Sequence, residues 1–417
     1  MPFPSSATAT PIQDNPDTLL RQRARRVVPG GMWGHMNVAS LPEGYPQFYR
    51  SAKGCRLTDV SGREYIDFMC SFGPIILGHH DPEIDDAAIA QGRRGDTMNG
   101  PGECLVELAE LLVETIPHAD WATFSKNGTD ATTTCVTIAR AATRRRKILV
   151  ARGSYHGAVP WCTPSLVGVT AEDRAHIIYY DYNDLESLTS AVEQAKGDLA
   201  AILATAYRHD VRRAQEMPTL DFLRTMRQIC DDTGAALILD DVRAGFRLHL
   251  GGSWEVYGVR PDLSAWSKAI ANGYPLAAVT GRDAFREAAA SIYITGSFWC
   301  SAVPMAAAIA TIRKLHRSDA AAKLERAGDR FRNGLQKQAA RLGLSLQQTG
   351  PSQMPMLLFE DDAEFRLGGL FVAEALANGV FLHPWHNMFL SLAHSDAEID
   401  LALEGTARAL EAVARIA

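Results

Sequence analysis

A single lysine, Lys268, lies where a buried strand would end. It follows the apolar run Leu263–Ser267 and precedes Ala-Ile-Ala-Asn-Gly, whereas most of the other lysines lie in helices or polar turns. Burial at a strand end disfavours an ammonium ion, lowers its pKa and leaves a nucleophilic amine. A lysine that reaches outward to solvent would give the same pattern, so this residue alone does not decide between the two.

Two further polar groups follow apolar runs of the same kind. Asp240 and Asp241 come directly after Ala236–Leu239, where a carboxylate needs a partner: a helix N-terminus, a cation, or the protonated nitrogen of a heterocycle. The run Trp121–Phe124 leads into Ser125–Thr129, which contains Asn-Gly-Thr and precedes a predicted helix. Backbone N–H groups at a helix start bind anions such as phosphate, although ordinary strand-to-helix turns also carry Gly and a capping Thr.

An amine, a carboxylate and an anion site together match one cofactor, pyridoxal 5′-phosphate (PLP). The lysine would form a Schiff base with its aldehyde, the aspartate would hold the proton of its pyridine nitrogen, and the helix start would bind its phosphate. The Schiff base makes a substrate C–H bond acidic, the ring accepts the electrons, and the released lysine moves protons. The sequence therefore predicts a PLP enzyme with Lys268 and Asp240 as catalytic residues.

These residues lie in a region where apolar runs alternate with amphipathic helices. The predicted strands are 121–124, 147–151, 177–180, 199–203, 236–239, 263–267 and 277–280, and the predicted helices between them are 129–143, 185–194 and 220–232. This alternation is typical of an α/β fold with a parallel sheet covered on both faces, in which ligands bind beyond the carboxyl ends of the strands. We therefore expect the three polar groups to meet at one edge of the sheet.

The rest of the chain predicts an arm before the sheet and a smaller domain after it. Pro, Ser and Thr dominate residues 1–16, which is typical of an irregular arm. We divide the chain into an N-terminal arm and helix segment (1–50), a large PLP-binding domain (51–318) and a small C-terminal domain (319–417).

The composition is that of a globular protein. The 417 residues are 47% hydrophobic and 22% charged, enough for two or three domains. A net charge of −6 argues against nucleic acid or an anionic membrane as a partner, and no apolar run approaches the ~20 residues of a membrane span. Without a secretion signal, and with scattered cysteines in neither paired nor zinc-binding spacing, we expect reduced thiols, no metal site and a cytoplasmic protein.

The stretches around these residues resemble the class III, fold-type I PLP-dependent aminotransferases, most closely the branch of glutamate-1-semialdehyde 2,1-aminomutase. The resemblance covers roughly residues 20–415. Its motifs are Lys126-Asn-Gly-Thr-Asp-Ala131, Ser154-Tyr-His-Gly157, Leu239-Asp-Asp-Val-Arg-Ala-Gly-Phe-Arg247, Gly258-Val-Arg-Pro-Asp-Leu263, Ser267-Lys-Ala-Ile-Ala-Asn-Gly-Tyr-Pro275 and Thr295-Gly-Ser297. It implies a large domain with a mostly parallel seven-stranded sheet and a smaller α/β C-terminal domain.

The resemblance also implies roles for matched residues. Its cofactor-contacting residues are Asn127, Gly128, Thr129, Tyr155, His156, Asp240, Val242, Lys268 and Ser297. The first three would hold the phosphate, Tyr155 would stack on the pyridine ring with His156 beside it, and the valine would pack under the ring. Ser297 matches a phosphate ligand that the family takes from the neighbouring subunit, which implies a homodimer with shared active sites.

The sequence departs from the aminomutase pattern where that family binds its substrate. Trp33-Gly-His-Met-Asn37 replaces a stretch whose arginine binds the substrate carboxylate, and Phe72 replaces a tryptophan. After Gly157, only about twenty residues replace a long Gly- and Ser-rich lid. Asparagine cannot copy the bidentate grip of a guanidinium, and a short lid retains an intermediate poorly. These differences argue against glutamate-1-semialdehyde as the substrate.

Two other stretches are unusual for the family. Its Glu-Pro pair after strand 199–203 becomes Ala204-Thr205, followed by the polar set Tyr207-Arg-His-Asp210. No arginine for an α-carboxylate lies between 366 and 408, where His383, Trp385 and His386 are found instead. The residues expected to contact the substrate are Trp33, His35, Phe72, Tyr207, His383 and Trp385. They would suit a bulkier, hydroxylated or cyclic substrate, although the C-terminal three would also suit packing at a domain interface.

We therefore predict an aminotransferase that moves an amino group from an amino-acid donor to a ketone or aldehyde of a small polar metabolite. An aminomutase of the glutamate-1-semialdehyde type and a PLP-dependent racemase or epimerase are the alternatives. Turnover without a second substrate would indicate the mutase, and solvent deuterium at Cα without loss of nitrogen would indicate the racemase. The intact Lys268 and Asp240 disfavour an inactive binding protein of the same fold.

Overall fold

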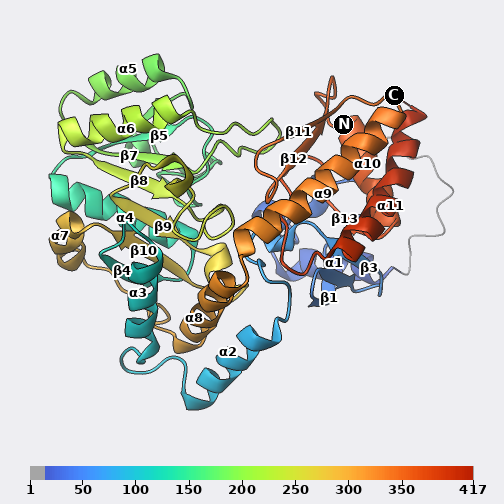
Figure 1. Cartoon of the computed structure of the whole chain (residues 1–417), viewed down its shortest axis with the longest axis horizontal. Helices are drawn as coiled ribbons and strands as arrows, with labels where there is room; N and C mark the ends of the chain where they lie inside the picture. The colour runs from blue at the N-terminus through green and yellow to red at the C-terminus, as the bar shows by residue number, and fades with distance from the viewer. Residues whose placement is uncertain (1–14, 417) are drawn as a thin grey trace. The chain divides into compact units, whose positions relative to one another are not determined.

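The computed structural model of the chain describes residues 15–416, which form two compact units (Figure 1). The first unit contains residues 15–72, 78–80 and 325–416, and the second contains residues 73–77 and 81–324. Most of the predicted arm, residues 1–14, lies outside the described residues. None of the helices in the described part of the chain is long and apolar enough to cross a membrane.

The second unit is built on a seven-stranded sheet with the order β4-β10-β9-β8-β7-β5-β6. Its strands are β4 (Trp121–Ser125), β5 (Lys147–Ala151), β6 (Ile177–Tyr180), β7 (Leu199–Thr205), β8 (Ala236–Asp240), β9 (Leu263–Trp266) and β10 (Ala277–Gly281). All neighbouring strands run parallel except β10, which is antiparallel to both β4 and β9. The predicted mostly parallel seven-stranded sheet is confirmed.

The helices of the second unit pack on this sheet or on one another. They are α2 (Pro82–Arg94), α3 (Cys104–Thr115), α4 (Gly128–Thr143), α5 (Leu185–Ala195), α6 (Leu220–Thr233), α7 (Arg286–Ser291) and α8 (Ala302–Arg317). Helix α4 packs across β7 to β10, while α5 packs on β5 and β6 and α6 packs on β7 and β8. Alternate strand residues such as Ile148 and Val150 form one core cluster with α4. Since β7 is buried along its whole length, its sequence is a continuous apolar run.

The first unit combines N-terminal and C-terminal elements. One sheet has the order β1-β2-β3-β13, and a second pairs β11 with β12. The elements are α1 (Pro16–Val27), β1 (Tyr49–Lys53), β2 (Arg56–Asp59), β3 (Glu64–Asp67), β11 (Leu346–Thr349), β12 (Met356–Phe359), α10 (Arg366–Ala377), β13 (Val380–Phe381) and α11 (Asp396–Ala414). Helix α9 (Ala320–Arg341) contains the boundary between the units.

The domain boundaries expected from the sequence stay a proposal, with one adjustment suggested by strand pairing. Strand β13 pairs in parallel with β3, so that Val380 lies opposite Ile66. This pairing groups residues 51–72 with the C-terminal segment rather than with the seven-stranded sheet. A pairing between such distant stretches leaves no local signal in the sequence. The sequence alone therefore predicts a domain boundary near residue 51.

Candidate active site

The carboxyl ends of β4, β8 and β9 meet at one edge of the seven-stranded sheet. Strands β8 and β9 are parallel neighbours, and β10 is antiparallel to both β9 and β4, so these three strands point the same way. A cavity of about 240 Å³ opens at this edge, within the second unit. It is lined by Asn127, Gly128, Thr129, Thr132, Tyr155, His156, Gly157, His209, Asp240, Val242, Arg243, Ser267 and Lys268. Every predicted cofactor-contacting residue except Ser297 is therefore present in one cavity.

The first turn of α4 forms a cup suited to an anion. The side chain of Asn127 caps the helix by accepting a hydrogen bond from the Asp130 N–H at 3.1 Å, and the Asn127 N–H donates to the Asp130 carboxylate at 3.1 Å. This reciprocal cap occupies the Asn127 side chain. The backbone N–H groups of Gly128 and Thr129 make no hydrogen bond within the described residues, and they are the donors that remain for a phosphate.

Two glycines let the walls of the cavity approach each other. A Cβ atom on Gly128 would lie 2.7 Å from Cγ1 of Val242, and one on Gly157 would lie 2.6 Å from Oγ1 of Thr129. Gly157 also has a φ of +131°, a backbone conformation that favours glycine. The glycines of both motifs are therefore required by close contacts.

The carboxylate of Asp240, at the end of β8, is held by two partners. Its Oδ2 lies 2.7 Å from Nδ1 of His156, and its Oδ1 accepts a hydrogen bond from the Val242 N–H at 3.1 Å. Asp240 is 6% exposed, and Nε2 of the buried His156 has no hydrogen-bond partner in the described structure. A carboxylate fixed in this way on a cavity wall is suited to hold a proton on the nitrogen of a bound ring.

The neighbouring carboxylate, Asp241, does not line the cavity. It accepts a hydrogen bond from the Ser253 N–H at 2.9 Å and lies 2.5 Å from the Ser253 hydroxyl. Burial raises the pKa of Asp241 to about 6. The structure thus separates two adjacent aspartates, one at the cavity and one in the protein interior.

Lys268 begins a short 3-10 turn, η7 (Lys268–Ala271), directly after β9. Its φ of +46° is in the left-handed region, where a residue other than glycine is strained by about 1–3 kcal/mol. Asn272 fixes the end of this turn, since its Oδ1 accepts hydrogen bonds from the N–H groups of Ile76 and Leu77 at 3.0 and 2.9 Å. The surrounding structure therefore holds Lys268 at the cavity despite its strained backbone.

The Lys268 amine makes no hydrogen bond or ion pair within the described residues. Its pKa falls from the usual 10.5 to about 7, chiefly through burial. The positive charges of Arg243 and Arg247 lower the pKa as well, while Asp240 opposes them. Near neutral pH a large fraction of this amine is uncharged and therefore nucleophilic.

Sequence patterns do not single out two residues that line the cavity, His209 and Arg243. Arg243 is buried, and its Nη1 donates a hydrogen bond to the backbone oxygen of His209 at 3.1 Å. The unusual set 207–210 is the only signal for His209, and it does not tell which member faces the cavity. Tyr207 does not line the cavity; it is fully buried, and its ring packs edge-on against His209 with centroids 5.2 Å apart.

The other predicted site residues lie elsewhere. Ser297 is exposed in the irregular segment before α8. The remaining substrate candidates, Trp33, His35, Phe72, His383 and Trp385, belong to the first unit. There Phe72 lies 4.6 Å from His35 and 6.3 Å from His383 between ring centroids, and His383 lies 5.4 Å from Trp385. These four rings form an aromatic cluster, whereas Trp33 is 69% exposed.

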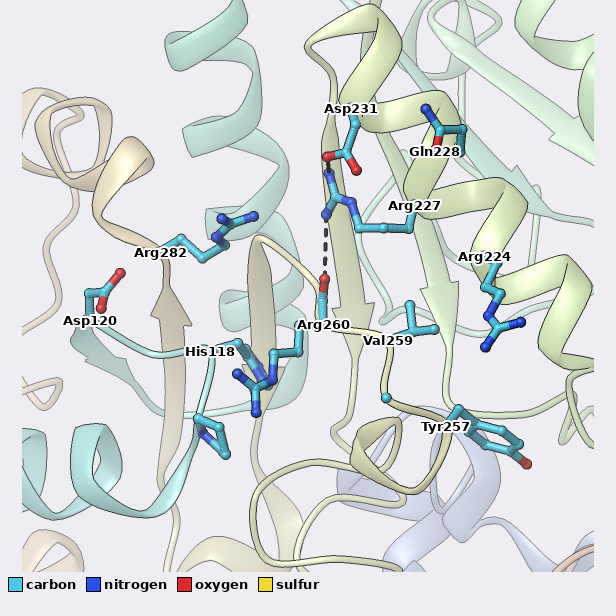
Figure 2. Close-up of a pocket in the computed structure, with 12 residues that line it drawn as sticks. His118, Asp120, Arg224, Arg227, Gln228, Asp231, Tyr257, Val259, Arg260 and Arg282 are labelled. Atoms are coloured by element: carbon cyan, nitrogen blue, oxygen red, sulfur yellow. Dashed lines mark hydrogen bonds and ion pairs between the residues drawn. The ribbon is translucent and has the colours of Figure 1, made fainter.

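A larger hollow of about 840 Å³ is lined by residues of α6 and of the segment before β9, and Lys268 is not among its lining residues (Figure 2). Its arginines are Arg224, Arg227, Arg260 and Arg282. All but the first form ion pairs with carboxylates at 2.7–3.1 Å. The hollow contains none of the predicted site residues, and its charges are largely neutralised within the protein.

The residues of the smaller cavity fit PLP. It provides free backbone donors for the phosphate, a buried carboxylate for the ring nitrogen and a largely uncharged lysine for the aldehyde. The unpartnered His156 Nε2 and the glycine contacts show that its walls are shaped around a group that the protein itself does not supply. Among the described residues, no group of three or more His, Cys, Asp or Glu is arranged to hold a metal ion.

Comparisons with known proteins point to one family. The family model described as aminotransferase class-III matches residues 40–410. An aminopentol aminotransferase of Sphingopyxis macrogoltabida is 51% identical, covering 95% of this chain and 94% of the relative. A glutamate-1-semialdehyde 2,1-aminomutase of Chloroherpeton thalassium is 31% identical, covering 94% and 97%. The solved PLP internal aldimine form of the FumI protein of Sphingopyxis sp. MTA144 has a TM-score of 0.95 at 51% identity and covers 96% of both chains.

Replacing Lys268 by Met should stabilise the cofactor-free protein, by more at pH 7 than at pH 9. Because the folded-state pKa of the lysine is lowered to about 7, the unfolded chain binds an extra proton from there up to its usual 10.5. Wild-type stability therefore rises with pH in this window, and the advantage of Lys268→Met should shrink by about 1 kcal/mol per pH unit. Urea unfolding at pH 7 and pH 9 measures this, with the exposed Lys337→Met as the control. An advantage that stays constant with pH would show that the amine is not desolvated.

Proposed function

The chain belongs to the class-III aminotransferases, and from this premise we propose that it transfers an amino group between a polyhydroxylated amine and a carbonyl compound. PLP is its cofactor, and an amino donor and a carbonyl acceptor are its substrates. The finer proposal rests on the 51% identity to a relative whose name specifies an aminopentol, that is, an amine with five hydroxyl groups. The aminomutases, at 31%, are more distant relatives.

When bound, PLP supplies an aldehyde that condenses with amines and a ring that accepts the electron pair of a breaking C–H bond. Gly128 and Thr129 would hold its phosphate through their backbone N–H groups. Asp240 would keep a proton on the ring nitrogen, and His156 would orient that carboxylate. The Lys268 amine would act as the nucleophile toward the aldehyde and, once released, would carry a proton from one substrate carbon to another.

The substrate pair predicted from the sequence fits this proposal. An amino acid and a polar ketone or aldehyde on one side correspond to a keto acid and a hydroxylated amine on the other. We propose that the aromatic cluster of His35, Phe72, His383 and Trp385 contacts the substrate, because imidazole nitrogens bind hydroxyl groups and ring faces pack on C–H groups. This role remains an expectation from the sequence.

A half-reaction screen tests the substrate class. The purified holoenzyme is mixed with single amines, and the loss of the visible absorption band of bound PLP is followed. The amines are an amino polyol, the matching alkylamine without hydroxyl groups, and L-glutamate. We expect kcat/KM for the amino polyol to exceed that of the alkylamine by up to about tenfold for each hydroxyl group that the site satisfies. Equal kcat/KM values for the amino polyol and the alkylamine would contradict the proposed substrate. If L-glutamate removes the band and neither of the other two amines does, the enzyme is an ordinary amino-acid aminotransferase.

We further propose a cytoplasmic homodimer with shared active sites. The seven cysteines are free thiols, as a reducing compartment would keep them. Ser297 does not line the cavity of its own chain, and its segment exposes two large rings, Tyr293 at 91% and Phe298 at 63%. Exposed rings of this size are typical of a surface that a partner covers. The family resemblance carries the rest of this proposal, namely that Ser297 completes the partner's phosphate site.

Mixing two inactive variants tests the shared site. One variant is Lys268→Ala, and the other carries Thr295→Trp together with Ser297→Trp. In a mixed dimer, the subunit with an intact Lys268 receives an intact 295–297 segment from its partner, so up to roughly a quarter of wild-type activity should return with random pairing. Subunit exchange is verified with a mass-tagged chain. If exchange occurs and no activity returns, Ser297 does not act across the subunits.

A further inference from the structure

The polar set Tyr207-Arg-His-Asp210 is unusual for the family, and one of its members lines the cofactor cavity. We propose that His209 contacts the cofactor and that its imidazole forms a hydrogen bond with bound PLP. The inference rests on the proposed function, because it assumes that PLP occupies this cavity. His209 would be a further cofactor-binding residue, outside the first turn of α4 and outside the motifs that contain Lys268 and Asp240.

The backbone fixes the direction of the His209 side chain. Beyond the end of β7, Arg208 and Glu216 form an antiparallel bridge, with N–H to oxygen distances of 2.8 and 3.0 Å. The Arg208 guanidinium lies 3.2 Å from the Asp210 carboxylate and 3.3 Å from that of Glu216. Side chains of adjacent residues in extended chain point to opposite sides, which leaves His209 facing the cavity while its neighbours pair with each other.

Two further contacts hold the imidazole in place. The backbone oxygen of His209 accepts the hydrogen bond from Arg243, a buried residue of the same cavity wall. The ring of Tyr207 meets the imidazole at an interplanar angle of 80°. The imidazole is therefore fixed on the cavity wall and is not a mobile surface group.

The imidazole keeps hydrogen-bonding capacity that no other described residue uses. His209 is 6% exposed, and the hydrogen bond that its ring makes is with its own backbone. Buried polar atoms in folded proteins are nearly always hydrogen-bonded, so the second ring nitrogen, which its own backbone leaves without a partner, indicates a ligand in this cavity. PLP, which Lys268 and Asp240 of the same cavity would hold, is the ligand that we assign.

The charge state of His209 suits this role. Burial lowers its pKa well below the usual value, and the positive charge of Arg243 acts in the same direction, whereas the hydrogen bond to its own backbone acts against them. A neutral imidazole offers one N–H donor and one acceptor nitrogen. It also adds no positive charge beside Asp240, the carboxylate that the ring nitrogen needs.

A purely structural role for His209 would be to fill space beside Tyr207. The two roles give opposite orders for two variants. His209→Leu fills the space but cannot form a hydrogen bond, whereas His209→Asn keeps a neutral hydrogen-bonding group and fills the space less well. A structural role predicts that the Leu variant resembles the wild type and that the Asn variant is impaired.

The test is PLP affinity in the purified full-length protein, measured by titrating the cofactor-free form with PLP. The position of the visible band gives a second readout, and thermal unfolding shows that each variant is folded. We expect His209→Leu to bind PLP on the order of tenfold more weakly than the wild type, with a shifted band, and His209→Asn to lie nearer the wild type. A Leu variant with wild-type affinity and band position, or an Asn variant weaker than the Leu variant, would overturn the proposal.

These readouts need no amine substrate, so they separate this inference from the proposed function. If the wild type binds PLP but does not turn over amino polyols, the substrate proposal fails and the order of the two variants still decides the role of His209. If the wild type binds no PLP at all, the proposed function fails first. The exposed His249→Leu is a control for the general effect of removing a histidine, and it should leave the PLP affinity unchanged.

Discussion

The active site depends on keeping a lysine amine uncharged close to a carboxylate without letting the two pair. A direct ion pair between Lys268 and Asp240 would stabilise the ammonium form and make the amine a poor nucleophile. The structure avoids it by giving both oxygens of Asp240 other partners, the His156 ring and the Val242 N–H. Arg243 and Arg247 add positive charge on the side of the amine, which lowers its pKa further.

The fold follows from this requirement. Strands buried on both faces can withdraw a carboxylate and an amine from water at their carboxyl ends, and β8 and β9 are such strands. The strained φ of Lys268 and the close contact between Gly128 and Val242 show how tightly the site is built. Class-III aminotransferases use PLP, and the arrangement of Lys268 and Asp240 suits that cofactor. His209, as we propose, adds a hydrogen bond to PLP from the wall of the cavity.

The sequence predicts the sheet well because its strands are mostly apolar, as in β5 and β6, whose bounds match the expectation. It also predicts that Lys268, Asp240 and Gly128 share an edge, since parallel strands bring their carboxyl ends together. It does not predict the pairing of β3 with β13, because that contact joins distant stretches. Nor does it tell Asp240 from Asp241 by residue type, or show that His209 rather than Tyr207 faces the cavity, since both distinctions depend on side-chain direction in three dimensions.

The most direct measurement is to locate the lysine that holds the cofactor. Borohydride reduction of the holoenzyme fixes PLP on the amine to which it is bound, and digestion followed by mass spectrometry identifies the labelled peptide. The low pKa of Lys268 and its place at the end of β9 predict that the label lies on Lys268 alone. Lys126 is the other lysine that the sequence places near the cofactor, because it lies just before the first turn of α4. Its amine donates a hydrogen bond to the backbone oxygen of Pro275, and Lys126 does not line the cavity. A label on Lys126, or on any lysine other than Lys268, would contradict this account.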